Sequence, residues 1–185
     1  MGGRSSNFGR LNRRSNKSSF YETEEDLMYA WTMDPPDKGT PEYREMVSKL
    51  NEFIGDSKYS GTAYRGLEFS SEEEFNKAFP GVDASVKLGQ NELVSLTASR
   101  HSAVDFATQG FGSVPVILVI EGGVSNSRIV PGTEDMGGMQ ELLTKNSNNY
   151  KITKIQTERL HPNDSSYDGY EDDFAKVVYL KQKRK

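Results

Sequence analysis

The longest apolar run in this 185-residue chain, Val114–Ile120, is only seven residues long, and that length limits what the chain can build. A run of this size fits a β-strand, and its three valines and two isoleucines favour extended backbone. A membrane-spanning helix needs about 20 consecutive apolar residues. The sequence therefore predicts a buried strand over 114–121 and no segment that crosses a membrane.

Two segments near the start have the apolar spacing of amphipathic helices. Thr23 is expected to cap the first of them, with Asp26 at the third helical position. Thr40 is expected to cap the second, with Pro41 at its first position and Gly55 just beyond its end. The chain therefore begins with a helical part.

Short strands and helices are predicted to follow from residue 60 onward. The expected strands are 62–67, 92–96, 114–121, 141–143, 150–155 and 175–180, and the expected helices are 72–79 and 99–109. Helices followed by mixed strands and helices are typical of an α+β fold. We predict a basic, disordered arm over 1–19, one domain over 20–180 (helical over 20–57, core over 58–180), and a basic tail over 181–185.

The charge of the chain is unevenly distributed. The net charge is −4, yet both ends are basic, so the body between them is acidic. This pattern argues against nucleic-acid binding by the body and leaves it open for the ends. The chain has no cysteine, which excludes disulfides and thiolate chemistry, and its two histidines give no metal-site pattern. The start has no apolar leader segment, so a cytoplasmic protein is expected, in the host cytoplasm if it is a delivered effector.

Arg65 lies in the otherwise apolar strand 63–67. A guanidinium there must reach the rim of the sheet or pair with an anion, because an unpaired buried cation is too costly. Its planar fork suits phosphate oxygens, and Gly66 removes a side chain that would block a ligand. The alternative is an ordinary ion pair with a carboxylate on a neighbouring strand.

Two more strands carry polar groups. Ser95 and Thr97 place two hydroxyls on one strand face, with Leu96 pointing into the core. Thr97 is followed by Ala103, Phe106 and Ala107 on one face of the predicted helix. Glu141 precedes an apolar pair of leucines and follows a glycine-containing loop. Taken singly, these are ordinary features of strand edges.

In this order along the chain, the segments that contain Arg65, Ser95 and Glu141 resemble the Arg-Ser-Glu class of mono-ADP-ribosyltransferases. This class includes the iota-type toxins and the clostridial Rho-modifying exoenzymes. The resemblance implies two packed, mainly antiparallel sheets with flanking helices. It implies a glycosyltransferase that takes NAD as substrate, without a metal, and transfers ADP-ribose to a macromolecular acceptor, protein or nucleic acid. An antitoxin or inhibitor would be a further partner of such a protein.

The resemblance also assigns roles to individual residues. Arg65 and Gly66 would hold the dinucleotide, Ser95 would orient Glu141, and Thr97 would support the strand. Glu141 would stabilise the positive charge that develops on the ribose as nicotinamide leaves. The aromatic rings of Phe106 and Phe111 would enclose the nicotinamide.

One position departs from the class and leaves alternatives open. Met139 stands where the class generally has Glu or Gln to engage the acceptor, and its thioether cannot orient a guanidinium. The acceptor therefore stays unidentified, although Glu134 or Gln140 could substitute. The alternatives are an NAD glycohydrolase, a nucleic-acid-directed transferase guided by the basic ends, and a non-catalytic binding or virion module of the same fold.

Overall fold

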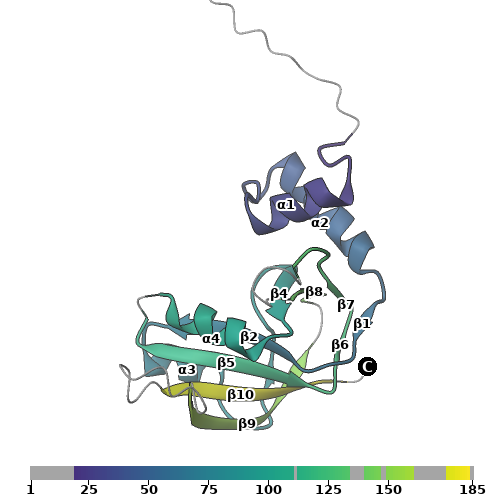
Figure 1. Ribbon diagram of the computed structural model, residues 1–185. Helices are drawn as coiled ribbons and strands as arrows, with labels where there is room; N and C mark the ends of the chain where they lie inside the picture. The colour runs from purple at the N-terminus through teal and green to yellow at the C-terminus, as the bar shows by residue number, and fades with distance from the viewer. Residues whose placement is uncertain (1–18, 111, 134–139, 147–148, 161–173, 184–185) are drawn as a thin grey trace, which may run out of the picture. The chain divides into compact units, whose positions relative to one another are not determined.

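The computed structural model describes residues 19–110, 112–133, 140–146, 149–160 and 174–183, and these contain four helices and ten strands (Figure 1). The chain divides into two compact units, Met1–Met46 and Val47–Lys185, and the point of division falls within the second helix. No helix of the described ranges is long and apolar enough to cross a membrane. The helices are α1 (Glu24–Thr32), α2 (Pro41–Ile54), α3 (Glu72–Ala78) and α4 (Arg100–Thr108). The strands are β1 (Lys58–Tyr59), β2 (Ala63–Phe69), β3 (Ser85–Val86), β4 (Leu93–Thr97), β5 (Val114–Glu121), β6 (Val124–Ser125), β7 (Ser127–Ile129), β8 (Glu141–Lys145), β9 (Tyr150–Arg159) and β10 (Phe174–Gln182).

Local capping fixes where the first two helices begin. Thr23 Oγ1 accepts a hydrogen bond from the N–H of Asp26 at 3.0 Å, and Asp26 Oδ2 accepts one from the N–H of Thr23 at 3.1 Å. This reciprocal pair is the predicted capping box. In α2, Thr40 Oγ1 accepts from the N–H of Tyr43 at 3.1 Å, and Gly55 follows the last turn with a φ of +52°. Both predicted starts are confirmed.

The strands form a two-stranded sheet, β1–β6, and an eight-stranded sheet in the order β3-β9-β10-β5-β2-β4-β8-β7. All pairings among the described strands are antiparallel except β5 with β10, which is parallel. The predicted α+β class with mainly antiparallel sheets is confirmed.

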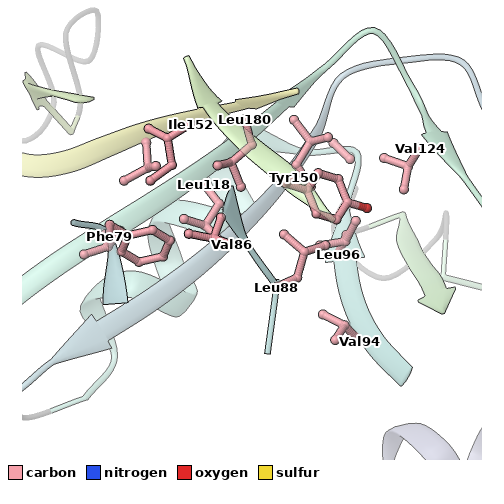
Figure 2. Packing of buried hydrophobic residues seen from close by; sticks show 14 of the residues in the cluster. Phe79, Val86, Leu88, Val94, Leu96, Leu118, Val124, Tyr150, Ile152 and Leu180 are labelled. Carbon is pink, nitrogen blue, oxygen red and sulfur yellow. The ribbon is translucent and has the colours of Figure 1, made fainter. Parts of the chain in front are cut away.

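The eight-stranded sheet changes direction at one place, the β2–β4 junction, where the two strands pair only through Tyr64 and Thr97. Strands β4, β8 and β7 turn away there from the layer of β2, β5, β10 and β9 (Figure 1). Apolar residues from both parts nevertheless share one core. In Figure 2, Leu96 of β4 lies close to Tyr150 of β9. The junction therefore joins two packed parts of one sheet.

Helix α4 covers the other face of β2, β5 and β10. Ala103 and Ala107 are fully buried against Ile117 and Val177. The approach is so close that a Cβ atom at Gly66 would lie 2.0 Å from the carbonyl oxygen of Ala103. Gly66 therefore allows the helix backbone to lie directly on the strand.

Candidate active site

The three residues singled out in the sequence lie on three neighbouring strands and are joined by two hydrogen bonds. Arg65 of β2 donates from Nη1 to the carbonyl oxygen of Ser95 on β4 at 3.0 Å. The hydroxyl of Ser95 donates to Oε1 of Glu141 on β8 at 2.5 Å. A guanidinium, a hydroxyl and a carboxylate from distant parts of the chain thus meet at one place.

Strand register explains why Ser95 meets Glu141. Thr97 pairs directly with Glu141, and Ser95 pairs with Leu143. Ser95 is therefore the diagonal neighbour of Glu141 on the same face, and diagonal neighbours lie within reach of long side chains. Leu96, between the two hydroxyls, is buried in the core as predicted.

Thr97 connects the site strand to the helix that follows. Its Oγ1 accepts a hydrogen bond from the N–H of Ser99 at 3.0 Å, and Ser99 in turn caps α4 by accepting from the N–H of Ser102 at 3.3 Å. The hydroxyl of Thr97 therefore holds the turn between β4 and α4.

The surroundings of Arg65 suit an anionic ligand. The guanidinium is largely buried, and this burial lowers the pKa of Arg65 from its usual range. Arginine nevertheless stays protonated in proteins at neutral pH. Within the described residues, the buried Nε of Arg65 has no hydrogen-bond partner. A charged donor without a partner is costly inside a protein, and an anionic oxygen of a ligand would satisfy it.

Gly66 and Phe106 lie on the helix side of β2, whereas Arg65 leaves the strand from the opposite face. Phe106 projects from α4 with 52% of its surface exposed. A role for either residue in holding NAD stays a prediction. Phe111, Glu134 and Met139 lie outside the described residues.

Sequence reasoning missed a second polar cluster, centred on Glu158 of β9. Its Oε1 accepts from the hydroxyl of Tyr179 at 2.6 Å and from the amide of Gln156, and its Oε2 accepts from Arg100 Nη2 at 3.3 Å. Burial alone would raise the pKa of Glu158, but the hydrogen bonds and the arginine outweigh it and lower that pKa. The hydrogen bond to Glu158 raises the pKa of Tyr179 to about 12. The cluster ties α4 to β9 and β10.

Removing this phenol should change how stability depends on pH. Tyrosine ordinarily titrates near pH 10, whereas the pKa of Tyr179 in the folded protein is raised to about 12. The contribution of Tyr179 to the free energy of unfolding is therefore fully present below about pH 10 and is lost as the pH rises through about 12. Tyr179→Phe should therefore lower the free energy of unfolding by about 1 kcal/mol at pH 7. Urea unfolding of both proteins should show this difference shrinking between pH 10 and 12; a difference that stays constant to pH 12 would contradict the assignment.

The architecture matches solved ADP-ribosyltransferases. C3larvin toxin, an ADP-ribosyltransferase from Paenibacillus larvae, aligns over 90% of this chain and 90% of its own, with a TM-score of 0.52 and 18% identity. The ADP-ribosyltransferase Vis, in complex with an inhibitor, aligns over 90% of this chain and 75% of its own, with a TM-score of 0.60 and 15% identity. The ADP-ribosylating toxin BECa of C. perfringens, solved with NADH, aligns over 85% of this chain and 39% of its own, with a TM-score of 0.50 and 16% identity.

No protein-family model and no curated protein matches the sequence. The likeness lies in the arrangement of helices and strands, and at these identities it defines the fold alone. The protein has an ADP-ribosyltransferase fold.

Proposed function

We propose that this protein cleaves NAD and transfers ADP-ribose to a macromolecular acceptor. The observation that carries the proposal is the 2.5 Å hydrogen bond from Ser95 Oγ to Glu141 Oε1, together with the Arg65 guanidinium bound to the Ser95 carbonyl. These three groups supply what the reaction needs: a cation for the phosphates, a carboxylate for the ribose, and a hydroxyl that orients the carboxylate.

The reaction breaks the bond between the nicotinamide nitrogen and the first ribose carbon, and the bonding electron pair leaves with nicotinamide. Positive charge then develops on the sugar, as it does in glycoside hydrolysis. The Glu141 carboxylate stabilises that charge by accepting a hydrogen bond from the ribose 2′-hydroxyl. A nucleophile of the acceptor attacks the same carbon and loses a proton. Ser95 donates to one carboxylate oxygen and so orients Glu141 toward the ribose.

The direct experiment is to incubate the protein with NAD labelled in the adenylate phosphate, in a lysate that contains proteins and nucleic acids. We expect nicotinamide release and label on a macromolecule. Protease and nuclease digestion then show which class of acceptor carries the label. Absence of nicotinamide release with every acceptor tested would contradict the proposal.

A second candidate, an NAD glycohydrolase, is favoured by one position in the sequence. Met139, two residues before Glu141, offers no group that could engage an acceptor side chain. In a glycohydrolase, water attacks the ribose carbon and free ADP-ribose is released. Release of ADP-ribose equal to that of nicotinamide, with no labelled macromolecule, would decide for this candidate.

Replacing Arg65 by Lys should weaken NAD binding. Lysine keeps the charge but loses the planar fork that can bind two oxygens at once. We expect the dissociation constant for NAD, measured by titration calorimetry, to rise about tenfold. Arg128→Lys is the matched control, because Arg128 also donates to a backbone carbonyl, that of Phe53 at 2.9 Å, and its guanidinium lies over the Phe53 ring, 4.3 Å from the centroid. Equal effects of the two substitutions would remove Arg65 from the NAD site.

A further inference from the structure

Strand β7 stops just short of covering Glu141. The last residue pair between β7 and β8 is Ile129 with Leu142. One more backbone hydrogen bond follows, from the N–H of Val130 to the carbonyl oxygen of Glu141 at 2.8 Å. Because the N–H and C=O of a strand residue point to the same edge, the N–H of Glu141 also faces the side where β7 has ended. That N–H needs another acceptor.

A tight turn brings such an acceptor to this edge. Residues Val130 to Thr133 close through a bond from the N–H of Thr133 to the carbonyl of Val130 at 3.4 Å. Pro131 at the second position and Gly132 at the third, with a φ of +80°, are typical of a type II turn. The turn reverses the chain and directs Thr133 toward Glu141.

The hydroxyl of Thr133 replaces the missing strand partner. Its Oγ1 accepts from the N–H of Glu141 at 3.0 Å and donates to the carbonyl of Val130 at 2.7 Å. Thr133 is only 5% exposed, so water does not compete for these bonds. On the other edge, the carbonyl of Gln140 accepts from the N–H of Ala98 at 3.1 Å. The backbone around Glu141 is thus held from both sides.

Gln140 shows that the chain enters β8 through an unusual conformation. Its φ is +33°, in the region that residues other than glycine seldom adopt. Such a conformation persists only where surrounding contacts determine it. The bonds of Ala98 and Thr133 on either side of the Gln140–Glu141 peptide are those contacts.

We propose that Thr133 is a positioning residue for the reaction: its buried hydroxyl fixes the Glu141 backbone so that the carboxylate meets Ser95 and the ribose. The inference rests on the proposed function and adds to it a residue outside the Arg-Ser-Glu set. Two substitutions separate the hydroxyl from the shape of the side chain. Thr133→Val removes the hydroxyl and keeps the shape, whereas Thr133→Ser keeps the hydroxyl.

Thr133→Val should lower kcat for nicotinamide release by about tenfold or more, because small displacements of a catalytic group reduce the rate strongly. The KM for NAD should change by less than about threefold, since Arg65 is untouched, and Thr133→Ser should keep about half of the wild-type kcat or more. A kcat within about twofold of wild type in Thr133→Val, with the wild type active, would overturn the inference and leave the proposed function intact.

Thr144→Val is the matched control on the same strand. Thr144 is fully buried, and its hydroxyl donates to the carbonyl of Asn126 at 3.1 Å, three residues along the strand from Glu141. This variant loses a buried hydroxyl bond without touching the Glu141 backbone, so it should be less stable yet keep the wild-type kcat. An equal loss of kcat in Thr144→Val would show a general loosening of β8 and would also overturn the inference.

Hydrogen exchange of the Glu141 amide, followed by NMR, tests the anchoring without any activity. The amide should be protected in the wild type and in Thr133→Ser and exchange about tenfold faster in Thr133→Val. Equal protection in Thr133→Val would show that the hydroxyl does not hold Glu141. If protection is lost as expected but the wild type releases no nicotinamide, the proposed function fails, and the catalytic role of Thr133 fails with it.

Discussion

Replacing Glu141 by Gln should lower the rate of nicotinamide release from NAD by about 100-fold or more. Removing one preorganised group that stabilises transition-state charge typically has an effect of this size. The amide oxygen of glutamine can still accept the hydrogen bond from Ser95 Oγ, so the fold should be preserved. The rate is measured as nicotinamide release, and the melting temperature checks the fold.

Glu121→Gln provides the control for this charge change. Glu121 is an exposed glutamate at the end of β5, and its loss should leave the rate unchanged. If Glu141→Gln keeps more than about a tenth of the wild-type rate, Glu141 does not stabilise the ribosyl cation. The same result in both variants would indicate an effect of net charge.

Replacing Gly66 by Ala should lower the free energy of unfolding by about 3 kcal/mol or more, the upper range for overpacking a core. The added Cβ would lie 2.0 Å from the carbonyl oxygen of Ala103 and 2.7 Å from the nitrogen of Ala107. Both are backbone atoms of α4, so no side-chain rotation can relieve the clash, and the helix must move. Urea unfolding at pH 7 measures the change.

Gly89→Ala is the appropriate control for this substitution. A Cβ at Gly89 would meet only a methyl group of Val94, at 3.5 Å, an ordinary contact. We expect its stability to stay within about 1 kcal/mol of wild type. A similar, small loss in Gly66→Ala would show that α4 is not seated on β2 as described.

The helices could be predicted well because the signals that start them are local. A threonine or serine side chain and a backbone N–H three residues later form each cap, and both lie in one short stretch of sequence. Ser71 and Ser99 cap α3 and α4 in the same way as Thr23 caps α1. The predicted helix 72–79 is one residue longer than α3, and 99–109 includes both caps of α4.

The strands were harder to predict than the helices, since the strands with which they pair are distant in the sequence. Strand β9 was predicted to end at residue 155 and continues to Arg159, so that boundary is wrong. Its last four residues, 156–159, are polar and show no alternation, and they become a strand by pairing with residues 174–177 of β10. Strands β1, β3, β6 and β7 have two or three residues each and carry no period that a sequence pattern can detect.

The site residues fall into the same two groups: those with a local sequence signal and those whose partners are distant in the sequence. Arg65, Ser95 and Glu141 could be found because each is a polar residue in an apolar strand and their order matches a known class. Thr133 was missed, although the Pro131-Gly132 pair before it signals a turn. The sequence gives no sign that the turn returns its next residue to Glu141, because that depends on where β7 stops. Tyr179 and Glu158 meet only through the pairing of two strands.

The position of β10 within the sheet has a consequence for synthesis on the ribosome. β10 pairs on one side with β5 and on the other with β9, yet it is the last strand of the described chain to be translated. While it is still inside the exit tunnel, one edge of β5 and one of β9 present open backbone groups, which are prone to pair with other chains. These edges can therefore be covered completely only after residue 182 has been synthesised and has left the tunnel. A chaperone bound to the nascent chain until then would prevent pairing with other chains.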